Sequence, residues 1–224
     1  MPDRLPTIPP NIRRTILPHD DLSVLGLLKF RLPIAARELA LLNANQTFFS
    51  ALEPTTMDIK MIRGTPMPPL AIVKQLTARI NPHDTQSIHC PHAPGLSGEH
   101  FPTWILSYWV EVAQIWPLKR TWVLAEESLE AWSRNKKCTD QTKGIITCIY
   151  NALSCTSWSG KIQGFPALIT TDHLAPYMMK NWLTDEQENQ MLYLLECELS
   201  RSRKGDGICV TDTFFMTKLT EIYQ

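Results

Sequence analysis

Tryptophan is concentrated in one short stretch of this 224-residue chain, because five of its seven tryptophans lie between residues 104 and 132. They are Trp104, Trp109, Trp116, Trp122 and Trp132. Tryptophan is large and its indole buries a large apolar area, so this density predicts a packed core in this part of the chain. It does not by itself indicate what the core is for.

The spacing of apolar residues in this stretch predicts helices. One stripe follows the pattern i, i+3, i+4, i+7, i+11 and consists of Ile105, Tyr108, Trp109, Val112 and Trp116. A second stripe consists of Trp122, Ala125, Leu129 and Trp132. Pro117 lies between them and is predicted to break or kink the helix. Helical spacing favours a core role for these indoles over a ligand-stacking role.

Composition excludes some classes of function. Lys plus Arg equals Asp plus Glu at 22 each, so the chain has no overall positive field for nucleic acid or an anionic membrane. A basic cluster at Arg201, Arg203 and Lys204 is predicted to be a solvated helix end. No apolar run is long enough to span a membrane, and the proline-containing start is not typical of a signal peptide. The six scattered cysteines favour reduced thiols, and hence an intracellular location in cytoplasm or nucleus.

The expected fold is mainly α, an irregular helical bundle in three parts. Residues 1–33 contain six prolines and are predicted to form an extended arm, with a short helix at 21–30. Residues 34–102 are predicted to hold helices at 34–52 and 69–80, followed by a loop rich in proline and histidine near 81–102. Residues 103–224 form the helical body.

Further helices are predicted in the second half of the body. One runs from about residue 140 to 153, and a short one follows a cap at residues 170–172. Thr184 and Gln187 form the pattern of a capping box that begins a helix extending to about Arg201. A final amphipathic segment covers residues 213–223.

The proline-rich loop contains several potential zinc ligands. They are His83, His89, Cys90, His92 and His100. Imidazole and thiolate bind zinc, but this spacing matches no standard site and contains no C-x-x-C pair. We therefore expect the loop to be metal-free and the chain to need no cofactor. Cys148 and Cys155 are seven residues apart, and we interpret them as small core residues in preference to a redox pair.

One segment resembles a known family. It contains Asp172-His173-Leu174, then Trp182-Leu183-Thr184-Asp185, then Met191-Leu192 and Leu194-Leu195. These motifs resemble the opening of the ubiquitin-like-protein (SUMO) protease fold, with Thr184 in place of the usual asparagine. The preceding region, from about residue 101, is similar to fungal, transposon-associated proteins that carry this protease domain behind a helical region.

The resemblance implies roles for two residues in binding a ubiquitin-like modifier or another protein. In such proteases the motif tryptophan lies over the channel for the Gly-Gly tail of the modifier, which would be the role of Trp182. The motif aspartate helps to bind substrate, which would be the role of Asp185. The alternative is that Trp182 is a core aromatic joining helices. Leu183 and Leu195 are expected in the core on either interpretation.

No set of catalytic residues is found in the family's order. The catalytic His, Asp, Gln and Cys of such proteases follow the motif, whereas the residues after Trp182 contain no histidine. Cys209 lies too close to the motif and has no base ordered with it. We therefore expect a truncated or degenerate relative that is not an enzyme by itself. The alternatives are an independent all-helical interaction module and, more distantly, an active cysteine peptidase or a metal-binding protein. Oligomeric state stays open.

Overall fold

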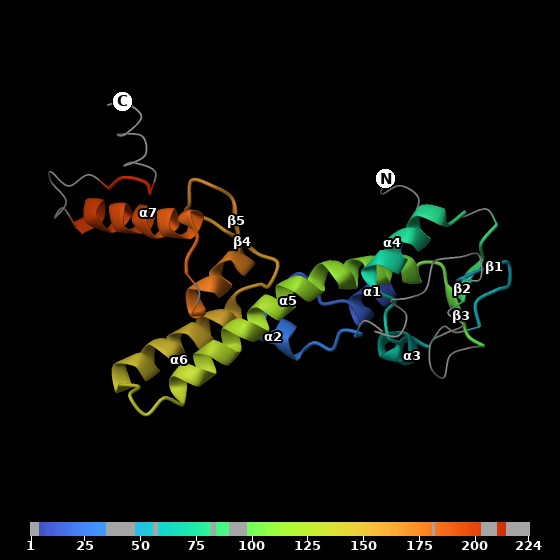
Figure 1. The fold of residues 1–224 in the computed structure, drawn as a ribbon, viewed down its shortest axis with the longest axis horizontal. Helices are drawn as coiled ribbons and strands as arrows, with labels where there is room; N and C mark the ends of the chain where they lie inside the picture. The colour runs from blue at the N-terminus through green and yellow to red at the C-terminus, as the bar shows by residue number, and fades with distance from the viewer. Residues whose placement is uncertain are drawn as a thin grey trace. The chain divides into compact units, whose positions relative to one another are not determined.

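The computed structural model describes residues 5–34, 48–55, 58–81, 84–89, 98–180, 182–202 and 210–213. The chain is mainly α, as predicted (Figure 1). It divides into two compact units, of which the first comprises residues 1–22 and 26–120 and the second residues 23–25 and 121–224. The division into arm, N-terminal part and body stays a prediction. Within the described ranges, no helix combines the length and hydropathy needed to cross a membrane.

The first unit combines helices with a small sheet. Its helices are α1 (Pro10–Ile16), most of α2 (Val24–Lys29), α3 (Ile59–Gly64), α4 (Leu70–Arg79) and the first half of α5 (Ile105–Ser133). The sheet is antiparallel in the order β1 (Phe49–Ser50), β2 (Ser87–His89), β3 (His100–Pro102). Phe49 is paired with Ile88, and Ile88 with Phe101. Both Ile88 and Phe101 are fully buried, so the sheet contributes one apolar face to the core.

The N-terminal arm is not wholly extended, which corrects the prediction from its prolines. Pro10 occupies the first position of α1, where the missing N–H has no helical partner to lose. Ile8, Ile16 and Leu17 are buried, so this segment packs as part of the unit. The short helix predicted at 21–30 is present as α2.

The helix predicted for residues 34–52 is wrong at its end, and residues 35–47 lie outside the described residues. Phe49 and Ser50 form strand β1, and residues 51 and 52 form a bend. The reason is tertiary, because β2 provides backbone partners for this segment. The helix predicted at 69–80 is present as α4.

The sequence predicted a break or a kink at Pro117. Helix α5 continues through this residue, so the prediction of a break is wrong. Its first stripe forms the centre of the first unit, where Ile105, Tyr108, Trp109 and Val112 are fully buried. The Trp116 indole N–H donates to the carbonyl of Pro33 at 2.7 Å. Packing and hydrogen bonds on both sides of Pro117 thus offset the one helical hydrogen bond that proline removes.

Lys119, two residues after Pro117, is buried and anchors α2 to α5 within the first unit. Its ammonium donates to the carbonyl oxygens of Leu27 at 2.9 Å and Leu28 at 2.8 Å, and also to that of Phe30. The carbonyls of Leu27 and Leu28 belong to the last turn of α2, where the helix itself provides no N–H four residues ahead, and Phe30 directly follows the helix. The Leu27 carbonyl also accepts from the Phe30 N–H at 3.1 Å. Burial lowers the pKa of Lys119 from its ordinary value. The lysine therefore acts as a side-chain cap for a six-residue helix.

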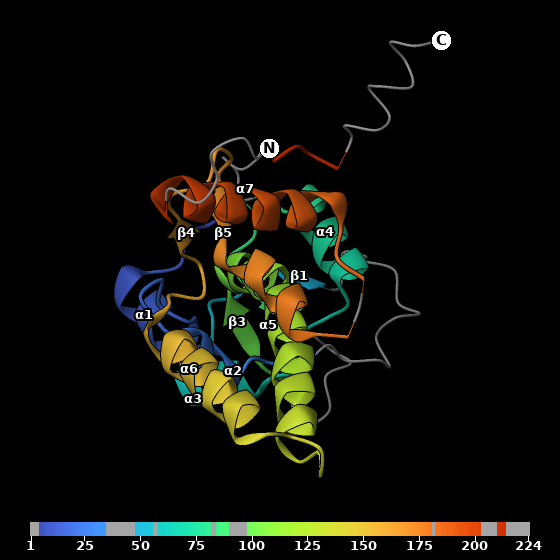
Figure 2. The same ribbon diagram turned by 90° about the vertical axis from the view of Figure 1, so that its left-hand side faces the viewer.

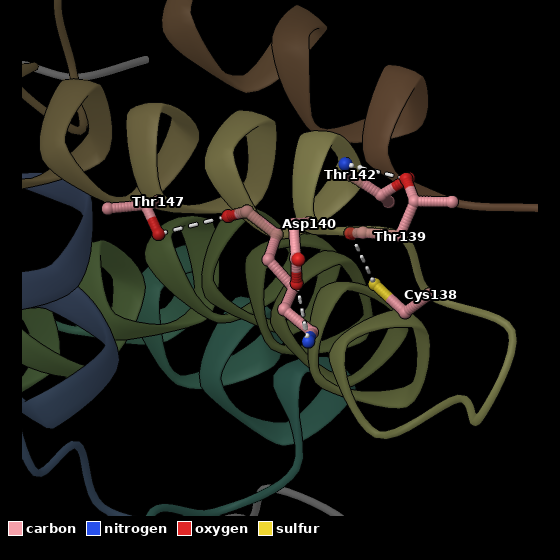
Figure 3. Close-up of polar contacts among 6 residues, drawn as sticks. Cys138, Thr139, Asp140, Thr142 and Thr147 are labelled. Carbon is pink, nitrogen blue, oxygen red and sulfur yellow. Dashed lines mark hydrogen bonds and ion pairs between the residues drawn. The ribbon is translucent and has the colours of Figure 1, made fainter.

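The second unit contains the end of α5, then α6 (Asp140–Cys155), β4 (Lys161–Ile162), β5 (Ile169–Thr170), the 3-10 helix η3 (Thr171–Met178) and α7 (Asp185–Ser202). Helix α6 runs back along the end of α5 (Figures 1 and 2). Its first turn is capped by Thr139, whose hydroxyl accepts from the Thr142 N–H at 3.1 Å (Figure 3). Residues 23–25 also belong here, since the Val24 N–H donates to the Thr156 carbonyl at 2.9 Å.

The core of the second unit is smaller than the sequence predicted. Trp122, Ala125, Leu129, Ile146 and Leu153 are buried. Trp132 is 42% exposed, because it lies in the last turn of α5. Cys148 and Cys155 are both exposed, so the core interpretation of these cysteines is wrong. The buried face of α6 is the one that carries Ile146 and Leu153, and the two thiols lie off that face.

Candidate functional site

Trp182 is the most exposed large apolar side chain among the described residues, at 97%. It lies in the irregular segment between η3 and α7. The alternative that Trp182 is a core aromatic is therefore wrong in this structure. An indole in solvent is unfavourable unless something covers it, so this residue is a candidate contact for a partner.

Helix α7 begins with the predicted capping box. The Gln187 N–H donates to the Thr184 hydroxyl at 3.4 Å, and the Thr184 N–H donates to the Gln187 side-chain oxygen at 2.9 Å. Three acidic residues occupy the first turn, namely Asp185, Glu186 and Glu188. Carboxylates are favoured there by the positive end of the helix dipole. Asp185, between the two capping-box residues, is exposed in the first turn of α7.

Helix α7 packs with polar side chains inward and several apolar ones outward. Gln187 and Gln190 are buried, and the Tyr177 hydroxyl contacts the Gln187 carbonyl and the Gln190 side-chain oxygen at 2.8 Å each. Burial raises the pKa of Tyr177, with a further contribution from Glu186. Three apolar side chains are about half exposed: Met191, Leu194 and Leu195. The expectation that Leu195 lies in the core is wrong, and Leu183 is half-buried.

A cavity of about 480 Å³ lies between α7 and the loop that precedes and enters β5. Its lining consists of Phe165, Pro166, Ala167, Ile169, Asp185, Glu186, Asn189, Gln190 and Tyr193. We call this the α7 groove. Figure 2 shows α7 lying beside β4 and β5, which is why the loop between these strands reaches the helix. The groove has apolar walls and a few polar groups, a mixture that is common in ligand-binding sites.

Aromatic and acidic side chains set the chemistry of the α7 groove. The rings of Phe165 and Tyr193 are 6.0 Å apart at an interplanar angle of 44°. A hydrogen bond with the Cys197 thiol raises the pKa of Tyr193, and the nearby charges add to this. The Glu186 carboxylate lies 3.7 Å from His173 Nδ1. The groove can therefore hold an extended apolar segment, with carboxylates at its edge for a donor or a cation.

The predicted metal candidates are only partly within the described residues. His83, Cys90 and His92 lie outside them, whereas His89 and His100 face each other across β2 and β3. His89 Nδ1 lies 3.2 Å from the Glu99 carbonyl, which can only accept, so this nitrogen carries the proton. The Ser87 hydroxyl donates to the Leu52 carbonyl, so it accepts from His100 Nδ1 at 3.1 Å. Each neutral ring therefore has its lone pair on Nε2.

The arrangement of these two rings does not favour a shared metal ion. Their centroids are 5.0 Å apart and their planes are only 19° from parallel. Nitrogen lone pairs lie in the ring planes, so two stacked rings do not direct them at one point. Across the described residues, no group of three or more His, Cys, Asp or Glu side chains is placed to hold a metal ion. That the loop is metal-free stays a prediction.

The resemblance implied Trp182 and Asp185 as site residues. The structure places Asp185 at the first residue of α7 and Trp182 three residues before it, in the irregular segment that precedes the helix. The sequence did not predict the opposite wall of the groove, formed by Phe165 to Ile169. The turn residues of that segment predicted a loop, but no periodicity indicated which helix the loop contacts. Cys209, the other candidate, lies outside the described residues.

Comparisons with protein-family models, curated proteins and solved structures found no match.

Proposed function

We propose that this chain is a protein-interaction module that binds a segment of another polypeptide at the start of α7, and that it does not cleave peptides by itself. The observation that carries the proposal is the 97% exposure of Trp182, three residues before the acidic start of α7. The first two residues of that helix, Asp185 and Glu186, line the α7 groove. Aromatic side chains are enriched in the contact centres of protein interfaces, and exposing one without a partner is unfavourable.

The resemblance to the opening of SUMO proteases suggests a ubiquitin-like modifier as the partner. In that family the motif tryptophan and aspartate contact the modifier, and Trp182 and Asp185 occupy those motif positions. On this proposal the chain is a relative of that family that retains a binding segment. The assignment of a ubiquitin-like modifier as the partner rests on the motif residues alone.

A second candidate is an independent helical interaction module with no modifier specificity. The exposed apolar side chains of α7 favour it, because they extend beyond Trp182 and Asp185, the two positions to which the resemblance gives a role in modifier binding. The first candidate depends on Trp182 and Asp185, whereas the second also uses the exposed apolar side chains of α7. Binding to a modifier distinguishes them.

The test is calorimetric titration of the 224-residue chain with a SUMO-type modifier ending in Gly-Gly. We expect binding that weakens at least about tenfold in Trp182→Ala, which corresponds to about 1.4 kcal/mol. Trp132→Ala is the matched control, since Trp132 is also partly exposed but belongs to α5. A modifier lacking Gly-Gly should bind more weakly. No binding of the parent to either modifier would contradict the first candidate and favour the second.

A further inference from the structure

Another side of α7, away from the groove-lining positions Glu186, Gln190 and Tyr193, carries a second surface with its own chemistry. Leu192, Leu195 and Leu199 are spaced i, i+3, i+7 and therefore follow one line along the helix. Leu195 is 49% exposed, and Leu192 and Leu199 are half-buried. Met191 lies beside this line and is 50% exposed. We call these four residues the α7 seam.

The side of α7 that packs within the second unit is a different one. Gln187, Gln190, Tyr193 and Cys197 carry its contacts, with Tyr177, Phe165 and one another. On a helix of 3.6 residues per turn, these positions lie roughly opposite the line through Leu192 and Leu195. The fold therefore uses this side of α7 for most of its packing, and the Thr213 N–H also donates to the Asn189 side-chain oxygen at 2.9 Å. The half-exposed seam residues Met191 and Leu195 lie on the other side.

The charges around the α7 seam indicate what fits it. Helix α7 contains five acidic residues and one basic residue, Arg201. Glu188 continues the line of the seam one turn before Leu192, Glu196 and Glu198 lie on either side of it, and all three are exposed. Among the described residues, Glu198 has a basic neighbour, with Arg201 Nη1 at 3.7 Å. A second copy of the chain would place the same carboxylates opposite one another. An anionic membrane or nucleic acid would be repelled in the same way.

We propose that the α7 seam binds an amphipathic helix of a partner protein, with leucine-type residues that pack against the seam and lysine or arginine residues on either side. A line of apolar positions at i, i+3, i+7 is the arrangement that accepts such a helix. Complementary charges at the flanking positions select the partner and its orientation. This inference rests on the proposed function only in that the chain acts by binding proteins; it concerns another face of α7.

The test uses two synthetic helical peptides with the same leucine seam, one with lysine and one with glutamate at the flanking positions. Fluorescence anisotropy with the 224-residue chain should show binding of the lysine peptide, weakening as salt is raised, because exposed charges are screened. The glutamate peptide should bind at least tenfold more weakly. Equal binding of both peptides, or of neither, would overturn the proposal.

Variants locate the contact on α7. Leu195→Asp should reduce binding of the lysine peptide at least tenfold, since a carboxylate would enter the apolar seam. The double variant Glu196→Gln and Glu198→Gln should reduce it severalfold and flatten the salt dependence. Glu127→Gln, an exposed acid on α5, is the matched control. Circular dichroism checks that each variant keeps its helical content.

Two further measurements distinguish a partner helix at the α7 seam from modifier binding at Trp182 and from self-association. Trp182→Ala should weaken modifier binding and leave peptide binding unchanged, whereas Leu195→Asp should weaken peptide binding. The two variants therefore test two separate faces of the molecule. Sedimentation of the parent should show a monomer at the concentrations used. Self-association that Leu195→Asp abolishes would identify a second copy as the occupant and overturn the proposal.

Discussion

At the scale of single residues, burial of the Tyr108 hydroxyl in the core of the first unit lowers the stability of the fold. Its side chain is fully buried, and its hydroxyl has no hydrogen-bond partner in the part of the chain that the structure describes. Burial raises the pKa of Tyr108 to about 12, although Arg63 opposes this. A buried hydroxyl without a partner costs roughly 1–3 kcal/mol.

Tyr108→Phe should therefore unfold at an equal or higher urea concentration than the parent at pH 7, with a gain of up to ~1–3 kcal/mol. The folded state binds the Tyr108 proton more tightly than the unfolded state does. Its contribution to stability is thus complete below pH 10 and is lost as the pH rises towards about 12. The variant should lose stability less steeply over that range. A large destabilisation at pH 7 would mean that the hydroxyl has a partner.

Trp109 is the buried counterpart of the exposed Trp182. Its side chain is 0% exposed in the middle of the first stripe of α5. Removing such a side chain typically costs about 3–5 kcal/mol. Trp109→Ala should lower the melting temperature sharply or prevent folding, whereas Trp182→Ala should change it little. A melting temperature within a degree or two of the parent for Trp109→Ala, with ready iodide quenching of Trp109 fluorescence, would contradict the core assignment.

At the scale of elements, Lys119 explains how a helix as short as α2 is held. Six residues are too few for a stable isolated helix in water, so α2 depends on contacts outside itself. Lys119→Met retains much of the side-chain volume and removes the three bonds to the carbonyls of residues 27, 28 and 30. We expect a loss of roughly 1–3 kcal/mol in the free energy of unfolding, measured in urea. Arg120→Met, at the exposed neighbouring position, should have little effect.

The elements also show which parts of the fold were predictable. The start of α7 depends on a reciprocal bond between Thr184 and Gln187, three residues apart, so local sequence specified it. Strand β1 depends on partners at Ser87 and Ile88, and no local pattern indicates them. Pro117 lies inside α5 because distant carbonyls and the surrounding core support that helix. The α7 groove could not be predicted either, because its second wall is a loop and no local pattern indicates which helix that loop contacts.

At the scale of the whole molecule, the proposed function predicts the absence of peptidase activity in this polypeptide. A thiol acts as a nucleophile in such enzymes only when a base is ordered against it, and the residues after Trp182 contain no histidine. Incubation of the 224-residue chain with a fluorogenic modifier substrate should give only the background rate. Cleavage that disappears in Cys209→Ala would overturn this prediction and support an active peptidase.

The short segment at Ser23 and Val24 bears on how the chain folds. Ser23 forms a bridge with Ser157, and Val24 bonds to Thr156, so the second unit is completed by residues about 130 positions earlier in the chain. Closing a loop of that length costs entropy that only the finished contact repays. During synthesis, residues 23–25 emerge long before their partners at 156 and 157. This contact of the second unit therefore forms only after translation has passed α6, and the order of folding does not follow the order of the sequence.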